Sequence, residues 1–127
     1  MKIRRSPEIT AQLLLINAKL YEKEREKEIT RLRISVDTLR RISGRTAIRE
    51  KFKEDLEEEL LELGWIFIQL DNEFAIMEKK RLQTWVRLSS KRLKDQGLLS
   101  LDSDCSETVQ ARFDDLIPAP EEESLDE

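Results

Sequence analysis

The chain has 127 residues, of which 39% are charged, and this composition is typical of a single small domain with long solvated helices. The net charge of −4 is unevenly distributed: residues 1–97 hold 22 basic and 17 acidic side chains, whereas residues 98–127 hold one basic and 10 acidic side chains. We therefore expect a mildly basic domain over residues 1–97, followed by an acidic tail, and the whole-chain charge does not exclude an anionic partner.

The first predicted element is a long N-terminal helix that begins at Pro7. Ser6 precedes it as an N-cap, and proline suits the first helical turn because its missing N–H is not needed there. A stripe at helical spacing follows and is expected to be buried: Ile9, Leu13, Ile16 and Leu20. Residues 21–28 alternate in charge, which indicates a solvated extension of this helix.

Two further helices are predicted on either side of Gly44. Ser35 is the expected N-cap of a short helix that ends at this glycine. A longer helix is then predicted from Arg45 or Thr46 to Leu63, with Gly64 ending it. Its predicted buried face consists of Ile48, Phe52, Leu56, Leu60 and Leu63. Two helices joined by a short turn that contains glycine resemble a helix-turn-helix.

A β-hairpin and a last helix are predicted next. Residues 65–70 and 73–77 are aromatic and β-branched, and Asp71-Asn72 suits the loop between two strands. The aromatic residues here and at Trp85 are expected in the core. A helix is predicted from Lys79 to Gln96, stopped by Gly97, with a face that comprises Leu82, Trp85, Val86, Ser89 and Leu93.

The acidic tail, residues 98–127, is expected to be largely disordered because it combines many charges with few apolar side chains. Four apolar residues could anchor it to the domain: Leu98, Leu99, Phe113 and Leu116. The predicted organisation is thus a domain over 1–97 and a tail over 98–127.

The order of these elements resembles the winged helix-turn-helix family of DNA-binding domains over about residues 8–96. The fold class that follows is mainly α with one β-hairpin, bounded by a long N-terminal helix and a C-terminal helix. The resemblance implies that the third helix lies in the major groove and that the hairpin reaches the DNA backbone. It also implies a transcriptional regulator and a homodimer formed by the N- and C-terminal helices, which suits a symmetric site.

Charge along the chain supports an interface with duplex DNA. From Arg31 to Lys53 there are eight basic residues and two acidic ones. On a helix that starts at residue 45, Arg45, Arg49 and Lys53 form one stripe for base and phosphate contacts. The remaining predicted contacts are to phosphates, from residues beside the turn and after the hairpin: Arg31, Arg33, Arg40, Arg41, Lys79, Lys80 and Arg81.

Other features indicate alternatives. The hairpin loop carries Asp71 and Glu73, although a loop that grips DNA should be basic. Basic side chains can also simply pair with neighbouring carboxylates on an exposed helix. The alternative function is a helical protein-interaction module, such as an accessory or inhibitor protein of a phage or plasmid. Its acidic face or tail would bind a basic partner.

Enzymatic chemistry has little support in the sequence. The chain lacks histidine and a glycine-rich phosphate loop, and Cys105 is its only cysteine. We therefore expect a binding protein that uses no cofactor or metal. No apolar run approaches the roughly 20 residues needed to cross a bilayer, so no membrane partner and a cytoplasmic location are expected.

Overall fold

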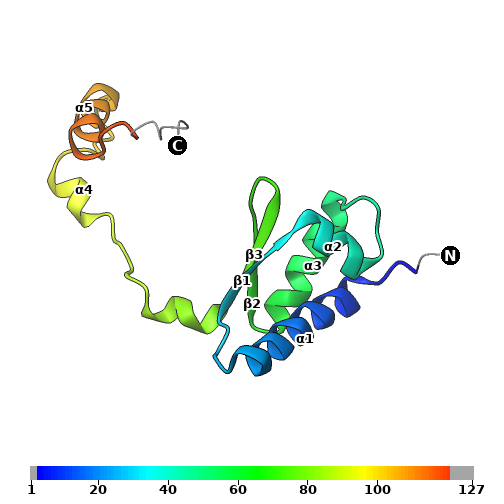
Figure 1. Ribbon diagram of the computed structural model, residues 1–127. Helices are drawn as coiled ribbons and strands as arrows, with labels where there is room; N and C mark the ends of the chain where they lie inside the picture. The colour runs from blue at the N-terminus through cyan, green and yellow to red at the C-terminus, as the bar shows by residue number, and fades with distance from the viewer. Residues whose placement is uncertain (1–2, 121–127) are drawn as a thin grey trace, which may run out of the picture. The chain divides into compact units, whose positions relative to one another are not determined.

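The computed structural model describes residues 3–120, which form helices and a small antiparallel sheet (Figure 1). The chain divides into two compact units, one ending at Trp85 and the other beginning at Val86. The sequence predicts this boundary further along the chain, at Gly97. None of the helices in the described part of the chain combines the length and the apolarity needed to cross a membrane.

Helix α1 (Pro7–Arg25) begins as predicted, with the Ser6 hydroxyl accepting a hydrogen bond from the Ile9 N–H at 3.2 Å. The prediction of its buried face was wrong. Ile9, Ile16 and Leu20 are 44%, 52% and 54% exposed, and Leu13 is half-buried. The buried residues are Thr10, Ala11, Leu14 and Ala18. Small side chains at this face let α1 lie close to α3. The close packing that results favours burial of this face over burial of the stripe with larger apolar side chains.

Helix α2 (Val36–Ser43) has the predicted caps at both ends. The Ser35 hydroxyl accepts a hydrogen bond from the Thr38 N–H at 3.0 Å, and Gly44 adopts a left-handed φ of 71°. Helix α3 (Glu50–Glu62) starts four to five residues later than predicted, because residues 45–49 form an irregular turn. Phe52, Leu56 and Leu60 are buried as expected.

The sheet contains one strand more than the predicted hairpin. The hairpin itself is confirmed as β2 (Trp65–Gln69) and β3 (Glu73–Glu78), but β1 (Arg31–Ser35) pairs with the other side of β3, so the strand order is β1-β3-β2. Both pairings are antiparallel: Ala75 of the central strand β3 lies opposite Arg33 of β1 on one side and opposite Ile68 of β2 on the other. Figure 1 shows β1 in cyan beside the green hairpin. This strand connects the end of α1 to the start of α2.

The core lies between α1, α2, α3 and one face of the sheet. Trp65, Phe67 and Phe74 are buried as predicted, and the two phenylalanine rings stack with their centroids 5.0 Å apart. Leu63, predicted on the buried face of α3, is instead 48% exposed, because the helix ends at Glu62 and the chain turns at Gly64. Ile48 packs against the core from the irregular turn.

The predicted helix over residues 79–96 is not formed. A 3-10 helix, η1 (Lys79–Thr84), ends before Trp85, and α4 is restricted to Lys91–Asp95. Three of the residues expected on its buried face are exposed and do not pack against the core: Trp85, Val86 and Leu93. Their lack of burial removes the main source of stability for a longer helix.

The prediction of a largely disordered tail was wrong for helix α5 (Ser106–Leu116). Its expected anchors Phe113 and Leu116 are exposed, as is Leu99, whereas Leu98 is half-buried. The acidic residues after 120 lie outside the described residues, so the prediction for them remains open.

Gly44 allows the N-terminal segment, residues 3–5, to lie on the end of α2. A Cβ added at Gly44 would overlap the carbonyl oxygen of Ile3, and the Arg5 N–H donates to the Ser43 carbonyl at 2.8 Å. Gly44→Ala is therefore expected to lower the free energy of unfolding by at least about 1–2 kcal/mol and to displace this segment. Denaturant unfolding and hydrogen exchange of the Arg5 amide measure the two effects.

Gly64→Ala is the matched control for this prediction. Gly64 has a similar φ of 88°, but nothing lies within 4 Å of an added Cβ. It carries the backbone strain without the contact, so the Arg5 amide should remain protected. Equal protection of that amide in Gly44→Ala would contradict the proposed role of the glycine.

Candidate nucleic-acid interface

The candidate interface begins where the N-terminal segment meets the C-terminal end of α2. The carbonyl groups at a helix C-terminus lack intrahelical partners and carry partial negative charge. Arg5 satisfies two of them: its backbone N–H donates to Ser43, and its guanidinium donates to the Ile42 carbonyl at 3.1 Å. The segment is thus held on α2 by hydrogen bonds that also bring basic residues to this end of the helix.

Arg45 is held in place by the turn that follows α2. Its guanidinium lies over the Phe52 ring, 4.0 Å from the centroid, and donates to the Arg5 carbonyl at 3.0 Å. Its Nε is buried without a hydrogen-bond partner among the described residues. Burial lowers the pKa of Arg45, and the neighbouring charge of Arg4 lowers it further. Arg45 therefore adds positive charge to the site from a restrained position.

Arg40 and Arg41 complete the group of basic side chains. Arg40 pairs with Asp37 at 2.9 Å, whereas the Arg41 side chain is exposed and makes no hydrogen bond or ion pair with any residue in 3–120. We define the arginine cluster as five residues from the N-terminal segment, α2 and the turn: Arg4, Arg5, Arg40, Arg41 and Arg45.

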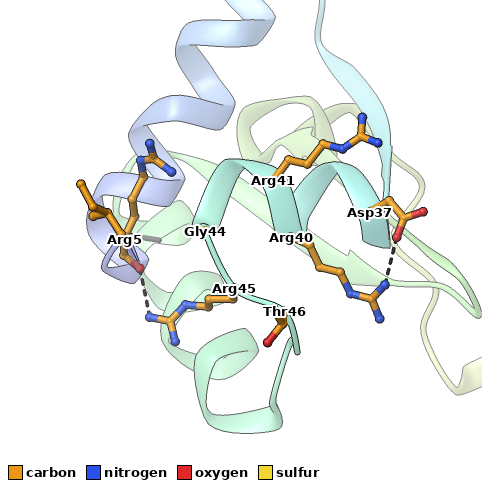
Figure 2. A pocket seen from close by; sticks show the side chains of 8 residues that line it. Arg5, Asp37, Arg40, Arg41, Gly44, Arg45 and Thr46 are labelled. Atoms are coloured by element: carbon orange, nitrogen blue, oxygen red, sulfur yellow. Dashed lines mark hydrogen bonds and ion pairs between the residues drawn. The ribbon is translucent and has the colours of Figure 1, made fainter. Parts of the chain in front are cut away.

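An open hollow of about 720 Å³ lies within the arginine cluster. Four of the five arginines line it, with Ile3, Gly44 and Thr46, and Asp37 is the one carboxylate among its described lining residues. Figure 2 shows the side chains fanning out around the end of α2: Arg40 and Arg45 lie on the side of Thr46, while Arg41 points the other way. The guanidinium groups are spread along a surface and do not converge on one point.

Helix α3 has the opposite charge. Its 13 residues include seven carboxylates and two lysines. Burial raises the pKa of Glu59, and the charges of Glu62 and Glu8 raise it further. The exposed side of α3 beyond its first turn would therefore repel phosphate.

The predicted basic stripe on the third helix does not exist. Because α3 begins at Glu50, Arg45 and Arg49 both lie outside the helix, and Arg49 is its exposed N-cap residue. The Lys53 side chain is only 14% exposed, since it pairs with Glu50 at 2.7 Å and donates to the Gln69 side chain at 3.0 Å. Of the three residues, only Arg49 is exposed to a partner.

The other predicted contacts lie on or beside the sheet. Arg31 and Arg81 line a separate hollow of about 460 Å³, with Trp85. Arg33 pairs with Glu73 at 3.1 Å, and Arg81 pairs with Glu28 at 2.9 Å. Lys80 lies 3.5 Å from Glu78, and Lys79 is exposed. Most of these charges are thus already compensated by carboxylates.

Two members of the arginine cluster, Arg4 and Arg5, were absent from the predicted site. The sequence shows them only as a basic opening before Ser6, and nothing in its spacing places them beside residues 40–45. The signal that could have found them is Gly44, because a C-terminal glycine leaves space for another chain segment to approach closely.

Comparison with known proteins does not assign the chain to a group: no protein-family model, no curated protein and no solved structure matches it. The geometry of the arginine cluster and the charge of the surrounding surfaces are therefore the basis for a functional assignment.

Proposed function

We propose that this chain is a small DNA-binding protein whose arginine cluster contacts the phosphates of duplex DNA. The observation that carries the proposal is the gathering of five arginines from three chain segments at the C-terminal end of α2. Four of them line the hollow, where Asp37 is the one carboxylate among the described lining residues. Arginine suits phosphate because its planar guanidinium can donate two parallel hydrogen bonds.

The arrangement of the arginines favours an extended polyanion over a compact anion. Arg5 and Arg45 are occupied in holding the N-terminal segment and the turn, so they supply charge from fixed positions. Arg4 and Arg41 are exposed and lack partners within residues 3–120, which leaves their donors available. Side chains that fan out over a surface match phosphates repeated along a strand (Figure 2).

The fold supports duplex DNA as the polyanion. Its helices and three-strand antiparallel sheet are compatible with a winged helix-turn-helix, whose members include transcriptional regulators. In that arrangement the residues around the α2–α3 turn approach DNA. The acidic side of α3 disfavours deep insertion into the major groove, so the proposal rests on phosphate contacts near the turn and expects weak sequence preference.

Chemical-shift mapping with a short duplex of mixed sequence tests the position of the interface. We expect the largest changes at the N-terminal segment, α2 and the turn, including the amides of Arg4, Arg41 and Thr46. The amides of Glu57 and Glu58, on the acidic side of α3, serve as internal controls and should change little. Changes concentrated on those two residues, or no changes at low salt, would overturn the proposal.

A second candidate function is the protein-interaction module, with the acidic side of α3 as its binding surface. The observation that favours it is the excess of carboxylates on α3, together with the raised pKa of Glu59. A basic segment of another protein would relieve the repulsion between these carboxylates. Such a partner, represented by a lysine-rich peptide, would change the shifts of Glu57 and Glu58 and leave those of the arginine cluster unaltered.

A further inference from the structure

The outer side of α1 is an apolar surface that the fold leaves uncovered. Ile9, Ile16 and Leu20 are between 44% and 54% exposed, and the half-buried Leu13 completes the stripe. With Ile42 and Arg41 of α2, the last three of these residues line a shallow groove of about 410 Å³. We define these four α1 residues as the outer stripe.

The spacing of the outer stripe is self-complementary. Its residues follow one another at steps of four, three and four, which read the same in both directions. When two α1 helices pair antiparallel about a two-fold axis, each residue i lies beside residue 29 − i of the other copy. Ile9 then meets Leu20 of the second copy, and Leu13 meets Ile16, so every apolar residue faces an apolar residue.

The charges beside the outer stripe fit the same arrangement. Glu8 and Lys19 are separated by 11 positions, about 20° around a helix, so they lie on the same flank. In the antiparallel pair, Lys19 is level with Thr10 of the second copy and therefore about 3 Å along the axis from Glu8. Opposite charges meet twice by symmetry. In a parallel pair related by an axis along the helices, the flank that carries Glu8 and Lys19 would instead face the opposite flank of the second copy, so these two residues would not meet.

We propose that the outer stripe binds a second copy of this chain, in an antiparallel helix pair with two-fold symmetry. The inference does not rest on the proposed DNA binding, although Arg41 belongs both to the arginine cluster and to the groove beside the outer stripe. Helix α1 has 19 residues and is about 28 Å long. A single helix face of this length is smaller than a standard interface of about 800 Å² per partner, so we expect a micromolar dimer and not an obligate one.

Sedimentation of the full chain from about 1 to about 200 μM tests the proposal. The wild-type chain should change from monomer to dimer over this range. Ile16→Asp should raise the dissociation constant roughly 30-fold or more, because the aspartate lies at the centre of the apolar contact. Leu61→Asp, at a similarly exposed apolar position on α3, is the matched control and should leave dimerisation unchanged.

Charge exchange tests the antiparallel geometry without altering the apolar contact. The exchange is made in a Glu22→Gln background, because the Lys19 ammonium pairs with Glu22 of the same helix at 3.2 Å. In that background Glu8→Lys and Lys19→Glu should each weaken the dimer, and the variant that combines them should regain the affinity of Glu22→Gln alone, because only antiparallel pairing opposes these two residues. This arm stays informative even where Ile16→Asp fails to fold, which circular dichroism would reveal. A wild-type chain that remains monomeric at the highest concentration overturns the proposal, as does failure of the combined variant to recover.

Discussion

Phe52→Ala is expected to lower the free energy of unfolding by about 3–5 kcal/mol. Phe52 is 5% exposed and lies within the core formed by the helices and the sheet. Its removal loses apolar burial and leaves a cavity that close packing cannot readily fill. The loss would be a large part of the 5–15 kcal/mol that is typical of a small domain.

The same ring also supports Arg45, whose guanidinium lies 4.0 Å above it. A cation–π contact of this kind contributes about 0.5–2 kcal/mol, depending on its exposure to water. Phe52→Leu keeps an apolar side chain but removes the aromatic face, so it should cost less stability than alanine while still releasing Arg45. Comparing the two variants separates core packing from support of the arginine cluster.

Urea denaturation of the variants measures these differences. Leu61→Ala is the control, because Leu61 lies on the same helix and is 46% exposed, so its loss should change stability by no more than about 0.5 kcal/mol. A similarly small change for Phe52→Ala would show that the ring does not support the core as the structure indicates.

Local signals in the sequence predicted the start of α1, both ends of α2 and the hairpin well. Ser6, Ser35 and Gly44 define caps through short-range hydrogen bonds or backbone conformation, so their effect can be recognised without the tertiary structure. The hairpin was equally recognisable, since β-branched and aromatic residues flank a short polar loop. The missed strand β1 also carried a signal: Leu32 and Ile34 alternate with arginines.

The burial of α1 could not be predicted from apolar periodicity. The helix presents two faces, one with large apolar side chains and one with Ala11, Leu14 and Ala18, and periodicity favours the larger. Which face is buried depends on how closely α3 approaches, and that distance is set by tertiary packing.

The prediction of a basic stripe on the third helix was wrong for a related reason. Helical phase puts Arg45, Arg49 and Lys53 on one stripe only if the helix contains all three, and the helix begins at Glu50. Helix ends are less well determined by sequence than helix interiors, and moving the start removes two of the three residues from the predicted stripe. Arg5 reaches the site through long-range hydrogen bonds to the Ile42 and Ser43 carbonyls, and Arg4 precedes it in the same segment. No local pattern around residues 4 and 5 reveals this placement.

Simultaneous replacement of Arg4 and Arg41 by glutamine is expected to weaken DNA binding and leave the fold intact. Both side chains are exposed, and neither has a hydrogen bond or ion pair with another residue between 3 and 120. Glutamine retains polarity and much of the length while removing the charge. Each phosphate contact that is lost should reduce the magnitude of the slope of log K against log[salt] by about 0.9, so the pair should reduce it by about 1.8.

Arg87→Gln with Arg92→Gln is the matched control, because it removes the same charge from two exposed arginines outside the arginine cluster. Any effect of net charge alone would appear equally in both double variants. Unchanged thermal unfolding of each variant would show that altered binding does not arise from loss of structure.

The salt dependence of binding to a mixed-sequence duplex, measured for the wild-type chain and these two double variants, tests the central claim most directly. Contact through the arginine cluster predicts wild-type binding that weakens as salt increases, a slope reduced by about 1.8 for the Arg4 and Arg41 variant, and a nearly unchanged slope for the control. Equal slopes for the two double variants, or no wild-type binding at the lowest salt concentration, would contradict it.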